Sequence, residues 1–247
     1  MKNTVVPKFT YVIPFRYRPD RVIALKRVVE WLSGFNGIEI LVVEQDKHSK
    51  IDTLTLKCRH IFVESEYPFN KAWAYNVAIR RTMSPVLVFG DADVIMHPND
   101  LIESLKALES HECIIPTSNI VQLSPPESSN DIQTIFSQKR FSPKINLTDG
   151  ISIFKRTAIE KIGGWNEDIL GHGFVNRFQD MKVKKMLNYK QMDFYAFHMF
   201  HRPEFPENGL VERNSKILEH YSNPMSDLQT HISTTVPRSG FLNKYQY

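Results

Sequence analysis

Nine residues, Pro85–Asp93 (PVLVFGDAD), decide how the rest of the sequence is interpreted. The apolar run Val86–Phe89 is typical of a strand that is buried on both faces of a parallel sheet. This run leads directly into a glycine and two acids, Asp91 and Asp93, that are separated by one small residue. Ligands of open α/β sheets bind beyond the carboxyl ends of the strands. The stretch therefore predicts a buried strand with a polar site at its end.

Strand and helix patterns alternate on the N-terminal side of this stretch. Apolar runs predict strands at Phe9–Ile13, Ile38–Val43 and Ile61–Val63. Apolar residues at helical spacing predict one helix that begins at Pro19 and another over Phe69–Met83. Successive β-α-β units imply right-handed crossovers and a mostly parallel sheet. We therefore predict an α/β, Rossmann-like single domain whose central sheet is flanked by helices.

The C-terminal half is less regular. The stretch Ser124–Pro143 is rich in Ser, Pro, Asn and Gln, which predicts a long surface loop. Further elements are expected as a strand at Asp149–Phe154, helices at Arg156–Ile162 and Phe174–Asn188, a strand at Met192–Met199 and a helix near Leu210–His220. No internal repeat or linker is evident. We predict one domain over residues 1–205, with residues 206–247 as a helical and irregular extension packed on it.

Composition and charge limit the class of protein. The 247 residues are 42% hydrophobic and 23% charged, as in a soluble globular protein. The net charge of +4 suits anionic ligands or a membrane surface but falls short of a nucleic-acid-binding signature. The two cysteines have no metal-like spacing and are expected to be reduced thiols. The lysines at one helical segment are expected to form a solvated face, with a phosphorylated or membrane-bound acceptor as the alternative: Lys182, Lys184, Lys185 and Lys190.

The sequence also bears on localisation. No apolar run approaches the roughly 20 residues of a membrane-spanning helix, and the first ten residues lack the apolar core of a signal peptide. A cytoplasmic protein is the expectation, with peripheral attachment to a membrane left open.

Two acids and two histidines could hold a metal ion. Asp91 and Asp93 can present oxygen atoms to a divalent cation and to a ribose hydroxyl, although an aspartate at a strand end also serves as a turn residue or helix cap. His198 and His201 lie three residues apart after a predicted strand and can face one ion. The alternative is a histidine pair that is satisfied by backbone hydrogen bonds. Together the two pairs predict a mixed oxygen–nitrogen site that phosphate oxygens complete.

Cations and aromatic residues occur together in two segments. Phe15–Arg18 (FRYR) follows the first strand, and Phe69–Lys71 (FNK) begins a helix. Arginine forks bind phosphate bidentately, aromatic faces can stack on a base, and helix N-termini favour anions. The alternative for the arginines is simple solvation. Trp165, beside two glycines, is either a core residue, which is the commoner fate of such a tryptophan, or part of the site.

A general base has to be a carboxylate or an imidazole near the acceptor hydroxyl. Four residues are eligible by their chemistry: Asp180, Asp168, Glu167 and His172. The side-chain chemistry alone does not choose among them.

Six short motifs occur in order from Phe9 to roughly Arg202. They are IPFRYR at 13–18, FNKA at 69–72 with Asn76-Val77, VFGDAD at 88–93, GIS at 150–152 with GGW at 163–165, GHG at 171–173 with Gln179-Asp180, and HMFH at 198–201. In this order they resemble the β-1,4-galactosyltransferase family and the wider metal-dependent glycosyltransferases of the GT-A fold. The resemblance implies the GT-A fold and the transfer of a sugar from a nucleotide diphosphate donor.

The resemblance also implies which residues contact the donor. Phe69 would stack on uracil, and Lys71, where the family tends to have arginine, would approach the diphosphate. Asp91 would contact the ribose side. The remaining residues assigned to the donor pocket are Pro14, Phe15, Arg16, Arg18, Ala92 and Trp165.

The resemblance further implies a metal set. Asp93 would bind the ion, His201 matches the family's metal-binding histidine, and His198 falls where animal members often carry methionine. An imidazole there should shift the metal preference, so Mn²⁺ or Mg²⁺ is expected. The base motif departs from the family pattern, because extra residues separate its parts and glutamine replaces glutamate. Asp180 is therefore the first candidate for the base and Asp168 the second.

We therefore predict a metal-dependent and inverting glycosyltransferase of surface-glycan synthesis. It would move a hexose or N-acetylhexosamine from a UDP-sugar to a carbohydrate or glycolipid hydroxyl. A retaining transferase is one alternative. A sugar nucleotidyltransferase is another, but it would usually have a glycine-rich phosphate loop, and Phe15–Arg18 contains no glycine. A non-catalytic glycan-binding module is the third alternative.

Overall fold

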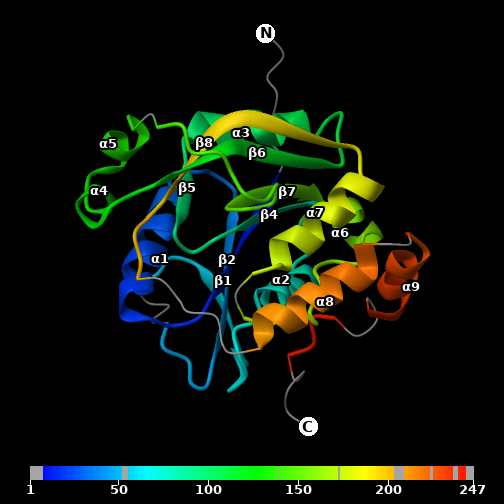
Figure 1. The fold of residues 1–247 in the computed structure, drawn as a ribbon. Coiled ribbons are helices and arrows are strands. Elements are labelled where there is room, and N and C mark those ends of the chain that lie inside the picture. The colour runs from blue at the N-terminus through cyan, green and yellow to red at the C-terminus, as the bar shows by residue number, and fades with distance from the viewer. Residues whose placement is uncertain are drawn as a thin grey trace.

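A computed structural model describes residues 8–51, 55–138, 140–171, 173–202, 209–222, 225–235 and 239–242 (Figure 1). One sheet runs through the centre of the molecule, in the strand order β3-β2-β1-β4-β7-β6-β8-β5. Its strands are β1 (Phe9–Phe15), β2 (Glu39–Asp46), β3 (Arg59–Glu64), β4 (Val86–Gly90), β5 (Val94–Met96), β6 (Cys113–Gln122), β7 (Ile151–Lys155) and β8 (Tyr189–His198).

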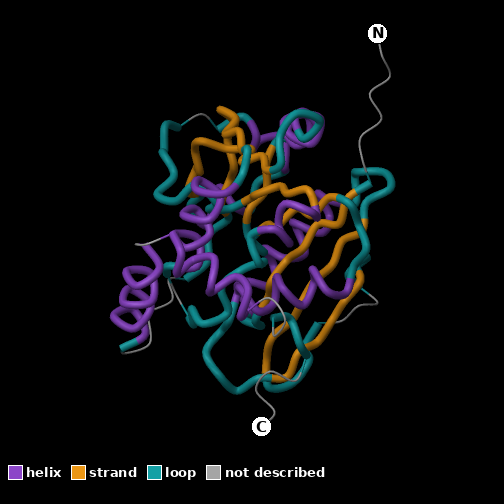
Figure 2. Tube along the Cα trace, turned by 90° about the vertical axis from the view of Figure 1, so that its right-hand side faces the viewer, coloured by secondary structure: helices purple, strands orange, loops and turns teal. Residues whose placement is uncertain are grey.

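Helices lie on both faces of this sheet (Figures 1 and 2). In chain order they are α1 (Pro19–Leu32), α2 (Lys71–Arg81), α3 (Pro98–Ala107), α4 (Pro125–Ser128), α5 (Ile132–Phe136), α6 (Arg156–Lys161), α7 (Val175–Met186), α8 (Leu210–Ser222) and α9 (Met225–Thr235). None of the described helices is both long and apolar enough to cross a membrane.

The N-terminal half of the sheet is parallel, as the sequence predicts. β1 pairs in parallel with β2 and with β4, and β2 pairs in parallel with β3. β7 then enters antiparallel to β4 and to β6, β5 pairs antiparallel with β8, and β6 and β8 are parallel. The carboxyl ends of β1, β2 and β4 therefore share one edge, where the short β5 and the end of β8 meet them.

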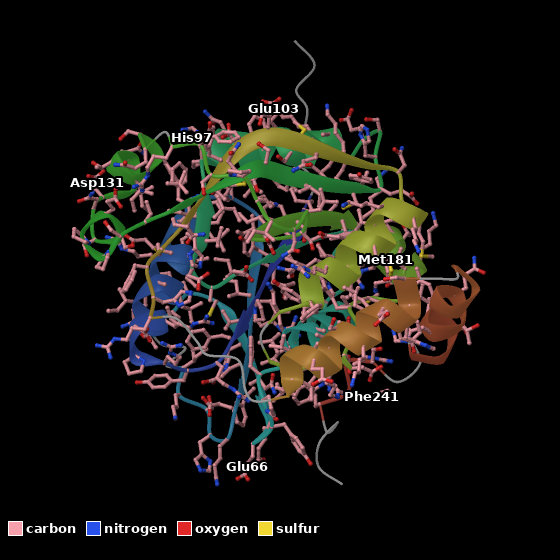
Figure 3. The ribbon with its side chains drawn as sticks, in the orientation of Figure 1. Glu66, His97, Glu103, Asp131, Met181 and Phe241 are labelled. Carbon is pink, nitrogen blue, oxygen red and sulfur yellow. The ribbon has the colours of Figure 1, made fainter. Side chains whose placement is uncertain are left out.

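The alternating side chains of β1 show why the sheet is buried on both faces. Tyr11 and Ile13 point into a core cluster with α1 and α3, whereas Val12 belongs to a cluster with α2, α6 and α7. All three side chains are fully buried. Side chains fill the space between the sheet and the helices on either side (Figure 3).

The structure adds elements that the sequence analysis did not assign. These are β5, α3 and β6, between Val94 and Gln122. In addition, the predicted surface loop at Ser124–Pro143 contains the short helices α4 and α5. Side-chain caps stabilise the first turn of each short helix. Ser124 and Glu127 form a capping box at the start of α4, and Asp131 accepts a hydrogen bond from the Thr134 amide at the start of α5.

Helices α8 and α9 belong to the segment that we predict to be a C-terminal extension. They pack on the α2 and α7 side of the sheet through Ile217, Leu218, Tyr221 and Leu228. α8 covers the predicted helix, and α9 is additional. The division at residue 205 stays a prediction. Both cysteines are unpaired thiols, as expected.

Candidate donor and metal site

The sheet brings Asp93 and His198 together from distant parts of the sequence. Asp93 immediately precedes β5, which pairs antiparallel with the end of β8 so that Val94 lies opposite His198. The Met199 amide donates a hydrogen bond to the Asp93 carbonyl oxygen at 2.8 Å. This pairing places the acid, just before β5, beside the histidine at the end of β8, at the edge where the parallel strands end.

Asp93, His198 and His201 form one cluster of ligand atoms. One carboxylate oxygen of Asp93 lies 3.4 Å from Nε2 of His198, and the other lies 3.3 Å from Nε2 of His201. The three ligand atoms lie within 4.8 Å of one another. With metal–ligand bonds of about 2.1 Å, neighbouring ligands of an octahedral ion are roughly 3 Å apart. The cluster therefore fits a divalent ion with only small side-chain movements.

Both imidazoles are held by their other nitrogen. Nδ1 of His198 lies 2.6 Å from the side-chain oxygen of Gln122, and Nδ1 of His201 lies 2.9 Å from the carbonyl oxygen of Arg202. An oxygen acceptor at Nδ1 places a proton there, so Nε2 of each ring is the nitrogen that would give its lone pair to a metal ion. The Nε2 atoms are the ones that face Asp93, and metal-binding histidines have this arrangement.

Electrostatics keep the Asp93 carboxyl ionised although the side chain is only 4% exposed. Burial alone would raise its pKa. A hydrogen bond from His198 and the charges of His198, Arg21 and His201 outweigh burial and lower the pKa to about 2. For His198, burial lowers the pKa, and the hydrogen bond and charge of Asp93 raise it overall. The site thus holds a fixed negative charge in a protected position, as a cation site needs.

Asp91 lies in the same turn and is paired with a cation. Its carboxylate is 2.5 Å from Nζ of Lys71, at the first position of α2. The negative charge of Asp91 contributes to a raised pKa of Tyr75, after burial, and to that of Tyr11. The Tyr11 hydroxyl is buried without a hydrogen-bond partner among the described residues. A side chain at Gly90 would overlap the Tyr11 phenol, which explains the glycine before the two acids.

Arg16 and Phe69 form a second part of this edge. The guanidinium of Arg16 lies over the Phe69 ring, 5.8 Å from its centroid, and donates hydrogen bonds to the carbonyl oxygens of Gln45 and Tyr67. Phe69 is half-buried, and its carbonyl oxygen accepts a hydrogen bond from the Gly171 amide. The predicted donor residues Arg16, Phe69 and Lys71 therefore gather at the ends of β1 and β2 and the start of α2.

Arg18 makes hydrogen bonds within the protein, and its contact with the donor stays a prediction. Its guanidinium donates hydrogen bonds to a carboxylate oxygen of Asp20 at 3.0 Å and to the carbonyl oxygen of Arg202 at 3.1 Å. Four other residues predicted for the donor pocket are buried, and their contact with a donor stays a prediction: Pro14, Phe15, Ala92 and Trp165.

Trp165 illustrates the core role. Its ring lies 4.7 Å from that of Tyr75 and 5.5 Å from that of Phe89. Asn76 binds its backbone amide and carbonyl groups. The motif Gly163–Glu167 is therefore a packed turn beneath α2.

The two predicted bases differ in their surroundings. Asp180, on α7, is 7% exposed and accepts hydrogen bonds from the Leu147 amide and from the amide and hydroxyl of Thr148. Burial raises its pKa more than these bonds lower it. Asp168 is exposed and lines an open cleft of about 690 Å³ beside α8. Of the other eligible residues, Glu167 is buried and binds Asn76, and His172 lies outside the described residues.

Lys144 is a largely buried amine that is influenced by the charge of Asp180. Its ammonium donates hydrogen bonds to the Thr117 hydroxyl and the Leu147 carbonyl oxygen. Burial lowers its pKa to about 8, against the opposing charges of Asp149, Asp180 and Asp91. Lys144 is therefore close enough to Asp180 and to Asp91 for both negative charges to raise its pKa.

Sequence reasoning was wrong about Lys182 and missed several residues of the site. Lys182 is 1% exposed and donates hydrogen bonds to the carbonyl oxygens of Ile162 and Gly164, so it does not belong to a solvated face. Its place four residues after Phe178, which is also buried, was the available signal. Gln122 and Asp20 were missed because their partners are far away in the sequence.

Comparison with known proteins identifies the family. Residues 12–163 match the Glycosyl transferase family 2, and the chain belongs to this family. No curated protein sequence is significantly similar to the chain.

Solved structures share the fold at low sequence identity. Drosophila β1,4-galactosyltransferase 7, solved with manganese, UDP-Gal and xylobiose, has a TM-score of 0.54 and 15% identity over 85% of this chain and 79% of that one. The mannosyltransferase PcManGT of Pyrobaculum calidifontis, solved with GDP-Man and Mn²⁺, has a TM-score of 0.53 and 17% identity over 95% and 72%. GalNAc-T7 with UDP, GalNAc and Mn²⁺ has a TM-score of 0.58 and 11% identity over 95% and 51%. The GT-A-type fold is thereby confirmed.

Proposed function

We propose that this chain is a metal-dependent transferase that moves a hexose or N-acetylhexosamine from a UDP-sugar to a carbohydrate hydroxyl, with inversion at the anomeric carbon. The cluster of Asp93, His198 and His201 carries the proposal, because it lies at the sheet edge where Lys71 and Arg16 also gather. A cation site beside positively charged side chains suits a diphosphate. The three structural relatives described above were solved with a nucleotide or nucleotide sugar and manganese, which supports the same ligands here.

The donor would be held by two groups of residues. Phe69, with Arg16 over its ring, offers a face for the uracil base. Lys71 would share its charge between Asp91 and the diphosphate, and Asp91 would accept a hydrogen bond from a ribose hydroxyl. These contacts orient the anomeric carbon before reaction, which lowers the entropic part of the barrier.

Asp93, His198 and His201 would hold the metal ion. An ion bound there would neutralise the charge that develops on the leaving diphosphate. Two imidazoles and one carboxylate suit Mn²⁺ better than Mg²⁺, because Mg²⁺ prefers oxygen ligands and its own water. We therefore propose Mn²⁺ as the preferred ion.

Asp180 is the proposed general base. A carboxylate offers about four lone-pair sites, and three of those of Asp180 are used, so one remains for an acceptor hydroxyl. Its raised pKa also makes it a better proton acceptor at neutral pH. Asp168, which is exposed beside α8, is the second candidate.

The acceptor is proposed to be a carbohydrate or a glycolipid of a surface glycan, handled in the cytoplasm or at a membrane surface. The Drosophila relative was solved with a carbohydrate, xylobiose, which supports a carbohydrate acceptor here. The order of the six sequence motifs is the reason that we propose a β-1,4-galactosyltransferase-like enzyme.

A donor and acceptor screen tests the proposal. UDP-hexoses and UDP-N-acetylhexosamines would be incubated with Mn²⁺ and a panel of saccharides, and released UDP and the anomeric configuration of the product would be measured. We expect Mn²⁺-dependent UDP release that Asp93→Ala abolishes, whereas Asp131→Ala, at an exposed cap of α5, has no effect.

Each alternative gives a different result in the same screen. Release of pyrophosphate would indicate a nucleotidyltransferase, and a retained anomeric configuration would refute the inverting assignment. UDP and Mn²⁺ binding without turnover on any acceptor would indicate a glycan-binding module.

A further inference from the structure

His201 lies in a segment that the sheet does not fix. β8 ends at His198, and the Met199 amide is held by Asp93. Beyond that point the backbone leaves the ladder, and the Phe200 amide binds the Ser128 hydroxyl instead. A metal ligand in such a segment needs another anchor, because an imidazole can otherwise turn away or change tautomer.

That anchor is provided by the start of α1. The Arg202 amide donates a hydrogen bond to a carboxylate oxygen of Asp20 at 3.0 Å, and the Arg202 carbonyl oxygen accepts one from Arg18 at 3.1 Å. Arg18 also binds the same oxygen of Asp20 at 3.0 Å. Both backbone polar groups of Arg202 are therefore bound by one ion pair from the first turn of α1.

The same Arg202 carbonyl oxygen determines the state of His201. It accepts the Nδ1 proton of that ring at 2.9 Å, which leaves Nε2, 3.3 Å from Asp93, as the nitrogen that would bind the ion. The position of this carbonyl thus decides both the direction of the ring and the nitrogen that faces the ion site. The hydrogen bonds of Arg18 and Asp20 are charge-assisted, and such bonds are roughly twice as strong as neutral ones.

We propose that Asp20 and Arg18 are positioning residues for the metal ion, which act by fixing Arg202 and through it His201. This inference rests on the proposed metal-dependent function. It assigns Arg18 a role in orienting a metal ligand, where the sequence resemblance suggested contact with the donor. It also makes the start of α1 part of the ion site, although neither side chain binds the ion.

Removal of Asp20 gives the first test. Loss of an outer partner of a metal-binding histidine typically weakens metal affinity by 10- to 100-fold. Mn²⁺ binding to the full chain would be measured by the electron paramagnetic resonance signal of free Mn²⁺. We expect Asp20→Ala to raise the Kd by about 10- to 100-fold, and Asp20→Asn to recover most of the affinity because its amide oxygen can still accept from Arg202.

A matched control separates this effect from helix capping. Asp100 is also an acid in the first turn of a helix that begins with proline, α3, but the charges that act on it are those of His97 and Glu103 and not those of the ion site. Asp100→Ala should bind Mn²⁺ like the wild type. Wild-type affinity in a folded Asp20→Ala protein would overturn the proposal.

The protonation state of His201 gives a second readout that needs no metal. Long-range ¹H–¹⁵N correlation spectra of the metal-free protein should show a proton on Nδ1 of His201. An Nδ1 without a proton in the wild type would overturn the proposal, even if Asp20→Ala does not fold. A wild type that binds no Mn²⁺ yet has the Nδ1 tautomer would refute the proposed function, whereas the positioning contact would stand.

Discussion

Asn76, on α2, holds the turn at Trp165 through three buried hydrogen bonds. Its amide group donates to the Trp165 carbonyl oxygen and to the Glu167 carboxylate, both at 2.8 Å, and its side-chain oxygen accepts from the Trp165 amide at 2.9 Å. Asn76 is 3% exposed and Trp165 is 2% exposed, so water cannot easily replace these partners. Asn76→Ala should therefore destabilise the fold strongly.

The structure sets the size of the effect. The substitution leaves a backbone amide, a backbone carbonyl and a carboxylate oxygen without this partner, and a buried polar group without a partner costs about 1–3 kcal/mol. The Glu167 oxygen keeps the Gly240 amide as a second donor, and the space left by the side chain can admit a water molecule, so the full sum is not expected. A loss of about 3–4 kcal/mol follows. For a domain of this size that corresponds to a decrease in Tm of roughly 6–16 °C.

Thermal and urea unfolding followed by circular dichroism would measure this loss. Asn99→Ala is the control, because Asn99 is exposed on α3 and should change the stability by less than about 0.5 kcal/mol. A loss below about 1 kcal/mol for Asn76→Ala would refute the view that the GGW motif is a packed structural turn.

Two further predictions concern buried charges. Burial lowers the pKa of Lys182 to about 7 from an ordinary value of 10.5, so the unfolded state binds more protons between these values and the free energy of unfolding should rise with pH in that window. Lys182→Met should flatten this rise in urea titrations at pH 7, 8 and 9, and an unchanged slope would contradict a buried amine. Asp180→Asn should lower kcat by roughly 10²- to 10⁴-fold, with a smaller effect of Asp168→Asn. The reverse order, measured with a donor that is turned over, would assign the base to Asp168.

Most of the fold could be predicted from the sequence because the N-terminal strands are apolar on both faces. Val86–Phe89 and Ile38–Val43 fall within β4 and β2, or overlap them closely. Elements with weak local signals were not assigned. β5 has three residues and gains its place only by pairing with β8, and α4 and α5 depend on capping side chains more than on apolar periodicity.

The sequence predicted the residues of the candidate site that would bind the ion, but not the residues that orient them. The spacing of His198 and His201 and the acids after β4 indicated which residues would meet. The partners that orient them, Gln122 and Asp20, come from other elements, and sequence offers no local signal for such contacts. The contacts of Arg18 and Trp165 within the protein could not be predicted for a related reason, since their partners come from distant parts of the sequence.

The metal-dependent nucleotide site is the central claim, and a thermal-shift titration tests it most directly. UDP, GDP, CDP and dTDP would each be added with and without Mn²⁺ to the wild type, to His201→Ala and to His48→Ala, which changes an exposed histidine. A ligand at 100 times its Kd stabilises by about 2.7 kcal/mol, which for this chain length gives a shift of roughly 5–10 °C. We predict a shift with UDP that requires Mn²⁺, persists in His48→Ala and disappears in His201→Ala. No metal-dependent shift with any nucleotide would contradict the account, because Asp93 and the histidines would then be a structural cluster.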